Sequence, residues 1–141
     1  MYAINRSPSV LPSNLVALTS AAVVQSFTVL EQCQVSDIFF VISTAVVSSG
    51  NVVVTFKRRP TIGSATGEVS IGTVVIPGGA AVGKVYYKKV SPVVCAVGEQ
   101  IVIEVTTAAA GGGAAGNGQG FFEAEQDPET PANNADMILS A

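Results

Sequence analysis

Apolar and polar residues alternate along most of this chain with a period of two, which is the spacing of side chains on the two faces of a β-strand. In residues 52–59, Val54 and Phe56 fall on one face, whereas Thr55 and Lys57 fall on the other. Residues 37–48 are nearly all apolar, as expected for a strand that is covered on both faces. The chain is therefore expected to be all-β.

Turn residues separate the alternating segments, as at Pro77-Gly78-Gly79 and Ser91-Pro92. The expected strands are residues 25–35, 37–48, 52–59, 68–76, 84–94, 100–107 and 121–126. About seven short strands at this spacing predict a β-sandwich, with a jelly roll as the expected form. A length of 141 residues suits a single domain.

The first 20 residues are expected to form an N-terminal arm or a short helix. Ser13 could cap a helix over residues 13–24, in which Leu15, Leu18 and Ala22 share a face. The β-branched residues of this stretch argue against a helix, because they have low helix propensity. The sandwich domain itself is expected over residues 21–127.

Two further segments are expected to lie outside the sheets. Residues 108–120 (AAAGGGAAGNGQG) are of low complexity, and their glycines predict a flexible loop before the last strand. Residues 128–141 are expected to form a C-terminal arm, because Pro128 and Pro131 disfavour a central strand. The apolar end of this arm could pack on its own domain or on a neighbouring molecule.

The chain contains no histidine, which removes the commonest general base and the Ser-His-Asp and Cys-His arrangements of nucleophilic catalysis. Two cysteines without histidine cannot complete a zinc site within one chain. We therefore expect no enzyme activity, no cofactor and no metal site. Cys33 and Cys95 lie in apolar segments and are interpreted as buried thiols, with a disulfide between them as the alternative.

Residues 78–84 (GGAAVGK) match the pattern GxxxxGK of phosphate-binding loops. A working loop of this kind needs Ser or Thr after the lysine and a helix whose N-terminus holds the phosphate. Here Val85 follows Lys84, and an expected strand follows in place of a helix. The segment is interpreted as a glycine-rich connection between strands.

No stretch reaches the roughly 18 apolar residues of a membrane-spanning helix, and no secretory signal is evident. We therefore expect no membrane partner and assembly in a cytoplasm.

Charged residues are scarce, at 12% of the chain, and they are unevenly distributed. Residues 1–89 hold seven basic and three acidic side chains, a net charge of +4, whereas residues 90–141 hold seven acids and no base, a net charge of −7. Opposite patches suit docking between copies or onto a scaffold. They could also face each other within one domain.

The candidate contact residues are Lys57, Arg58, Arg59, Lys88 and Lys89 on the basic side, Glu123, Glu125 and Asp127 on the acidic side, and Met137, Ile138 and Leu139 near the end of the expected arm. Nucleic acid is not an expected partner, because no aromatic side chains are interleaved with the basic residues to stack on bases. A calcium site at the three acids is a further alternative, but the sequence lacks a calcium-loop spacing.

Three segments carry a resemblance to a known family: residues 72–77 (GTVVIP), 83–87 (GKVYY) and 98–108 (GEQIVIEVTTA). They resemble the strands of capsid cement, or decoration, proteins of tailed bacteriophages that have a jelly-roll or β-sandwich fold. The resemblance covers the second half of the chain. It implies many copies on the outer capsid surface of a virion, as homodimers or homotrimers that bridge capsomers of the major capsid protein, and it carries over no catalytic residue.

The alternative function is a glycan-binding or receptor-binding module of a phage tail or head fibre, because β-sandwiches serve both roles. Sugar-binding surfaces depend on exposed aromatic faces, and this chain has no Trp and three Tyr. The composition therefore favours a structural protein over a glycan-binding one.

Overall fold

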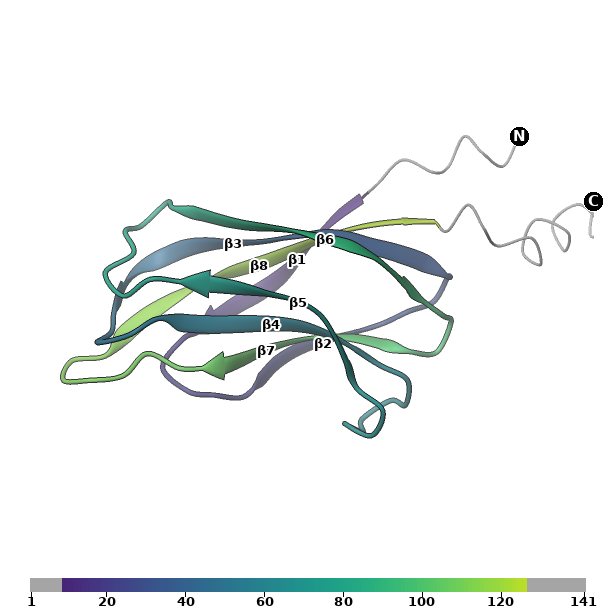
Figure 1. Cartoon of the computed structure of the whole chain (residues 1–141), viewed down its shortest axis with the longest axis horizontal. Helices are drawn as coiled ribbons and strands as arrows, with labels where there is room; N and C mark the ends of the chain where they lie inside the picture. The colour runs from purple at the N-terminus through teal and green to yellow at the C-terminus, as the bar shows by residue number, and fades with distance from the viewer. Residues whose placement is uncertain (1–8, 127–141) are drawn as a thin grey trace, which may run out of the picture.

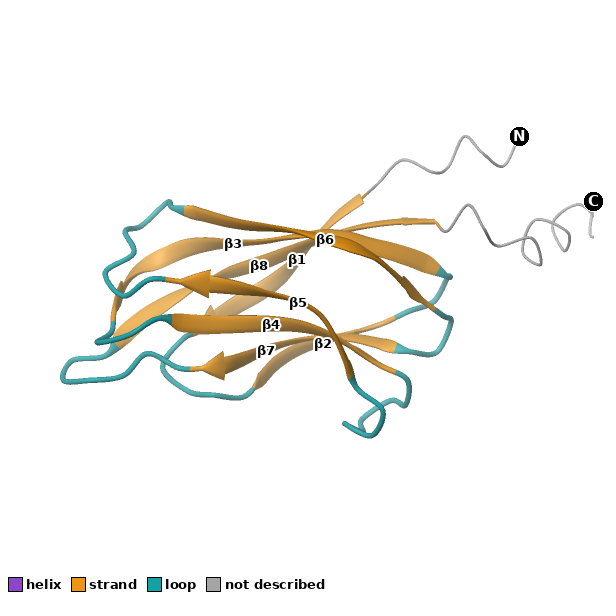
Figure 2. Ribbon diagram, viewed as in Figure 1, coloured by secondary structure: helices purple, strands orange, loops and turns teal. Residues whose placement is uncertain are grey.

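The computed structural model describes residues 9–126, and all regular structure within this range is β-strand (Figure 2). The strands are β1 (Ser9–Ala17), β2 (Val23–Thr28), β3 (Cys33–Val47), β4 (Val52–Arg59), β5 (Val69–Ile76), β6 (Val85–Cys95), β7 (Gln100–Thr107) and β8 (Ala115–Gln126). They form two antiparallel four-stranded sheets, β1-β8-β3-β6 and β2-β7-β4-β5, which lie one over the other (Figure 1). The predicted all-β sandwich is confirmed.

The strand pairing is that of one long hairpin that has been rolled up. Around the tip between β4 and β5, the pairs are β4-β5, β3-β6, β2-β7 and β1-β8. Rolling the hairpin adds the pairs β3-β8 and β4-β7 and divides the strands between the two sheets. This order is the eight-stranded jelly roll. Because β1 and β8 are neighbours, the chain enters and leaves the domain at the same end (Figure 1).

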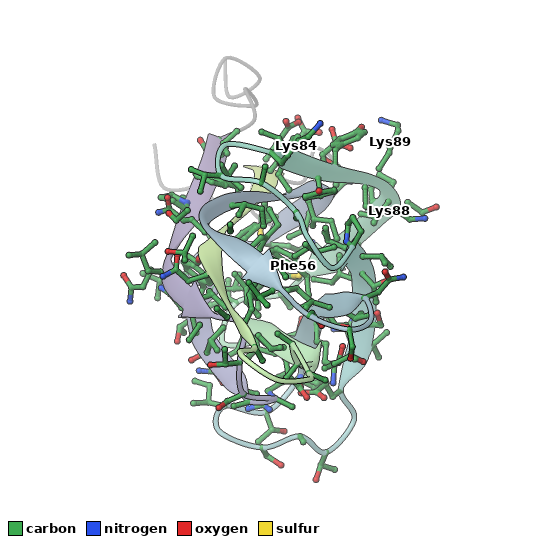
Figure 3. The ribbon with its side chains drawn as sticks, turned by 90° about the vertical axis from the view of Figure 1, so that its left-hand side faces the viewer. Phe56, Lys84, Lys88 and Lys89 are labelled. Carbon is green, nitrogen blue, oxygen red and sulfur yellow. The ribbon has the colours of Figure 1, made fainter. Side chains whose placement is uncertain are left out.

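The hydrophobic core fills the space between the sheets. Its largest side chains are Phe40 of β3, Phe56 of β4 and Phe122 of β8, each fully buried, and Figure 3 shows Phe56 between the two layers. Phe27 packs edge-on against Phe122, with ring centroids 5.0 Å apart. Valine and isoleucine make up most of the remaining core, and their branched side chains suit the pleated surface of a strand.

The expectation of an N-terminal arm or short helix needs correction, because residues 9–17 form strand β1 and residues 23–28 form strand β2. Ser13 does not cap a helix. Its hydroxyl accepts a hydrogen bond from the Gly120 N–H (2.9 Å), which ties β1 to β8. Pro12 is tolerated because β1 is an edge strand, and the register shifts directly after it. Residues 1–8 lie outside the described range.

The loop predicted over residues 108–120 is also too long, because residues 115–120 belong to β8 and pair with β1 and β3. Two of the glycines here are packing positions. A Cβ at Gly118 would collide with the ring of Phe40 and the carbonyl oxygen of Val41. A Cβ at Gly120 would lie 3.2 Å from the ring of Phe56. Bulky core side chains therefore approach the backbone of β8 where it has no side chain of its own.

The single strand predicted over residues 25–35 is in fact two strands in different sheets, β2 and β3. The connection between them is held to the β6-β7 connection, because the Val29 N–H donates to the Glu99 carbonyl and the Gly98 N–H donates to the Val29 carbonyl, both at 2.8 Å. Alternation continues through this connection, so the period alone could not reveal it. The expected break at residue 36 lies inside β3, where the register shifts.

Substitution of Gly118 by alanine tests the close approach of β3 to β8. We expect Gly118→Ala to lower the free energy of unfolding by about 1–3 kcal/mol, the usual cost of overpacking. Gly112→Ala is the matched control, because a Cβ there would meet open space, and it should change stability by less than about 0.5 kcal/mol. Urea denaturation of both variants measures the difference. Equal stabilities would show that the strand does not depend on this glycine.

Candidate protein-binding surface

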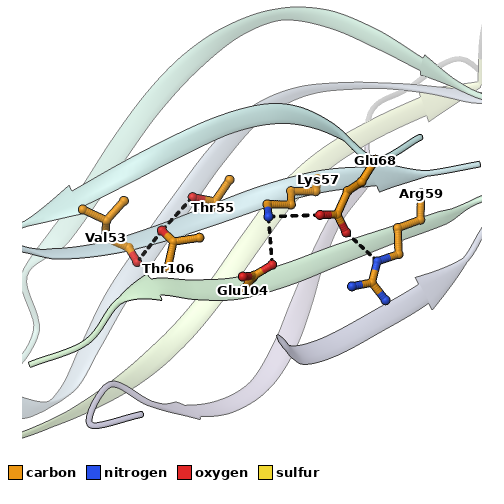
Figure 4. A network of polar contacts seen from close by, with 7 residues as sticks. All are labelled: Val53, Thr55, Lys57, Arg59, Glu68, Glu104 and Thr106. Carbon is orange, nitrogen blue, oxygen red and sulfur yellow. Dashed lines mark hydrogen bonds and ion pairs between the residues drawn. The ribbon is translucent and has the colours of Figure 1, made fainter. Parts of the chain in front are cut away.

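The outer face of the sheet β2-β7-β4-β5 carries a closed polar network, shown in Figure 4, and is called here the ion-paired face. Lys57 donates hydrogen bonds to Glu68 (3.0 Å) and Glu104 (2.9 Å). Arg59 donates to the second oxygen of Glu68 (2.5 Å). The Thr106 hydroxyl donates to the Val53 carbonyl at 3.2 Å. Two cations therefore meet two carboxylates on this face.

The network favours the ionised forms of Lys57 and Glu68. The hydrogen bond with Glu104 holds the pKa of Lys57 above its ordinary value, although burial opposes the shift. The hydrogen bond from Arg59 holds the pKa of Glu68 below its ordinary value, again against burial. Because the charges cancel within the network, this face offers little net charge to a partner.

Arg58 also has an acidic neighbour within the domain, since its Nε lies 3.5 Å from a carboxylate oxygen of Glu99. All three residues of the predicted basic cluster at 57–59 thus have ion pairs inside the domain. Lys57 and Arg58 pair with Glu104 and Glu99 of the acidic half, as the alternative of facing patches within one domain predicts, whereas Arg59 pairs with Glu68 of its own half. Their role as contacts to another molecule stays a prediction.

The outer face of the sheet β1-β8-β3-β6 is different, and is called here the apolar face. Pro12, Phe121, Phe39 and Tyr87 are register partners in that order, so they form one row across all four strands. Their chain neighbours Phe40 and Phe122 are fully buried in the core, so alternation points this row outward. The rings of Phe39 and Tyr87 have centroids 5.1 Å apart.

A second row lies beside the first and consists of Leu15, Gln119, Val41 and Val85, again in register across the four strands. Leu15 is 66% exposed and Val85 is 56% exposed. Gln119, the one polar side chain of this second row, donates a hydrogen bond to the Ser13 carbonyl (2.6 Å). A solvent-facing antiparallel sheet ordinarily carries polar side chains, so this apolar surface is a candidate interaction site.

Charged residues border the apolar rows. Lys84, Lys88 and Lys89 project from the region of β6 at the edge of the sandwich (Figure 3). Glu123 and Glu125 share the outward face of β8 with Phe121. Cations and carboxylates thus lie on different strands around the same apolar surface.

The border charges are weakly neutralised. Lys89 lies 3.8 Å from Asp37, and its side chain is 77% exposed, so this pair contributes little to stability. Lys84 and Lys88 make no ion pair within residues 9–126. The other predicted contacts, Asp127, Met137, Ile138 and Leu139, lie outside the described residues.

Among the described residues, the sequence prediction named only charged ones and missed the aromatic and aliphatic side chains of the apolar face. The missed set is Phe39, Val41, Val85, Tyr87 and Phe121. One signal was present, because the apolar run at 37–48 predicted a strand covered on both faces. In the described domain only the inner face of this strand is covered by the second sheet, and the outer face stays uncovered within residues 9–126.

Residues 9–126 lack the geometry of three other kinds of site. In the part of the chain with described coordinates, no group of three or more His, Cys, Asp or Glu side chains could hold a metal ion. No helix found there is long and apolar enough to cross a membrane. The GGAAVGK segment joins β5 to β6 without a helix, so it lacks the phosphate-binding geometry of its sequence pattern.

The sequence matches no protein-family model and no curated protein. A search of solved structures finds a structure of infectious bursal disease virus, Gx strain, with 11% sequence identity and a TM-score of 0.37. The match covers 87% of this chain and 33% of that chain, so this chain spans about a third of the other protein's length. The function is therefore inferred from the surface of the domain itself.

The Glu68 carboxylate should contribute to stability only where it is ionised. Because its folded pKa lies below the ordinary value of 4.5, its contribution is complete above that value and disappears as the pH falls through the folded pKa. We expect Glu68→Gln to lower the free energy of unfolding by about 1–2 kcal/mol at pH 7. The difference from the wild type should vanish in acid.

Urea denaturation between pH 7 and pH 3 measures this difference. Glu31→Gln is the control, because Glu31 is exposed and makes no ion pair among the described residues. A deficit of Glu68→Gln that stays constant down to pH 3 would show that the lost negative charge is not its cause.

Proposed function

We propose that this chain is a non-enzymatic structural protein of a virion. It binds the outside of a capsid through its apolar face and stabilises contacts between capsomers, as a cement or decoration protein does. The observation that carries the proposal is the pair of apolar rows that crosses all four strands of one sheet. The jelly-roll topology supports it, because this architecture occurs in viral capsid domains. The same architecture occurs in lectins. The topology alone therefore does not distinguish a capsid protein from a lectin, and the distinction rests on the outer surface of the domain.

The apolar face supplies the binding energy in this proposal. Leu15, Val85 and Tyr87 are each more than half exposed in the single domain. Complete burial of a large apolar side chain contributes about 1.5–3 kcal/mol, and the half that remains exposed here contributes part of that amount. A modest energy for each copy is sufficient, because an icosahedral capsid presents many equivalent sites and the total adds over all of them.

The charges around the apolar face orient the domain on its partner. Lys89 shares the outward face of β6 with Val85 and Tyr87, and Glu123 shares that of β8 with Phe121; complementary potentials fix register and exclude wrong partners. The ion-paired face has its charges neutralised internally, which suits a surface that is left in solvent. The proposed partner is the major capsid protein, with neighbouring copies of this chain at the rim.

Two matched substitutions test the assignment of the face. Val85 on β6 is 56% exposed on the apolar face, and Val75 on β5 is 50% exposed on the opposite sheet. We expect Val85→Asp to reduce occupancy on purified particles at least tenfold, because it places a charge in the contact. Val75→Asp should bind as the wild type does. Quantification of bound protein against the coat protein gives the result, with thermal denaturation to show that both variants are folded.

Equal binding by the two variants would remove the apolar face as the contact. Loss of binding by Val75→Asp alone would instead place the contact on the ion-paired face.

A second candidate function is a glycan-binding or receptor-binding module, favoured by one observation. Tyr87 is 53% exposed, lies against Phe39, and donates a hydrogen bond to Asp37 (3.2 Å), so an aromatic ring stands beside a carboxylate acceptor. Such a pair suits a sugar ring, which stacks on the aromatic face and donates hydroxyl hydrogen bonds. A glycan array decides between the two functions. A signal that Tyr87→Ala abolishes would favour the module, and an empty array would leave the cement function.

A further inference from the structure

Cys33 and Cys95 occupy directly opposed positions at one end of the apolar-face sheet. Cys33 is the first residue of β3, Cys95 is the last residue of β6, and the two are register partners. Directly paired residues of antiparallel strands have Cα atoms about 4.5–5.5 Å apart. Disulfides need about 4.4–6.8 Å between Cα atoms, so the strand pairing already provides the backbone distance.

The side chains of the pair also point to the same place. Cys95 belongs to the buried core, and Cys33 packs against that core from the neighbouring strand. A hydrogen bond between the two thiols, together with burial, raises the pKa of Cys95. Both groups are thiols in this structure. The two side chains therefore lie next to each other at the edge of the core.

The two thiols differ in their access to solvent. Cys95 is 0% exposed, whereas Cys33 is half-buried. A dissolved oxidant can therefore reach Cys33 first, and Cys95 is positioned to react only with a group that is already attached to Cys33. This difference fixes the order in which a two-step oxidation proceeds.

We propose that Cys33 and Cys95 are a modification site that closes to an intramolecular disulfide in the presence of a small disulfide oxidant such as oxidised glutathione. The Cys33 thiolate attacks one sulfur of the oxidant, forms a mixed disulfide and releases one glutathione thiolate. Cys95 then loses its proton, and its thiolate attacks the Cys33 sulfur and releases the second glutathione. Two protein thiols are oxidised, and one small disulfide is reduced to two thiols.

The bond would fasten β6, an edge strand, to β3 in the middle of the sheet. β6 contributes Val85 and Tyr87 to the apolar face, so the bond stabilises one border of the proposed contact. Thiols stay reduced in a cytoplasm and are oxidised outside it, so the disulfide would form after a particle is released from the cell. The chemistry of the pair does not depend on the proposed function, although this timing does.

The experiment uses the full chain, purified in reductant and then incubated with oxidised glutathione. Intact mass after denaturation and alkylation reports the state of both cysteines. We expect a monomer that has lost two hydrogen atoms, takes up no alkyl group and yields one linked peptide containing Cys33 and Cys95. Thermal denaturation should show a melting temperature higher by about 10 °C, because the bond closes a long loop.

Two variants test the order of the steps. Cys95→Ser should keep glutathione on Cys33, because the group that releases it is missing, whereas Cys33→Ser should stay unmodified while folded. A wild-type chain that remains fully alkylated, keeps the glutathione adduct or forms linked dimers would overturn the proposal, whether or not the variants fold. None of these outcomes bears on particle binding, which the Val85 and Val75 variants test separately.

Discussion

The pairing of β3 with β8 is the contact on which the rest of the structure depends. It joins residues 33–47 to residues 115–126 in the middle of one sheet, and it closes the rolled hairpin. The pairing requires glycine at position 118, where the ring of Phe40 lies against the backbone of β8. The same two strands place Phe40 and Phe122 in the core and Phe39 and Phe121 on the outside. One pairing therefore builds both the interior of the domain and the centre of its apolar face.

The outer faces of the two sheets carry different kinds of side chain. The ion-paired face uses Lys57, Glu68 and Glu104, whose charges satisfy one another at hydrogen-bonding distance. The apolar face leaves aromatic and aliphatic side chains exposed, and its border charges are only weakly paired. A sequence with 12% charged residues cannot cover both faces with charge. The division of these few charges between the faces is the physical basis of the proposed function.

Local patterns predicted the fold class and several strands. Alternation located the strand 100–107 correctly and placed Thr55 and Lys57 together on the outer face of β4. The strand predictions failed where the alternation of apolar and polar residues gives no information about the structure. Residues 25–35 keep their alternation while the chain crosses from one sheet to the other at Val29. The glycines at 118 and 120 predicted flexibility, whereas their role depends on aromatic rings from strands distant in sequence.

The candidate site was harder to predict than the fold, because a surface is formed by register and not by motifs. Phe39, Phe121 and Tyr87 become one row only when three strands far apart in sequence are aligned. The sequence singled out Lys57, Arg58 and Arg59 because they are adjacent, yet their acidic neighbours come from β7 and from the residues directly before β5 and β7. Adjacency in sequence thus gave a charge cluster that folding neutralises.

The most direct measurement compares hydroxyl-radical labelling of the protein alone and bound to purified particles. If the apolar face is the contact, Leu15 and Tyr87 are labelled in the unbound protein and protected on the particle, while Val75 on the opposite sheet is labelled equally in both states. Protection of Val75 with continued labelling of Tyr87 would contradict the assignment of the face. Unchanged labelling at all three residues would contradict binding through either sheet.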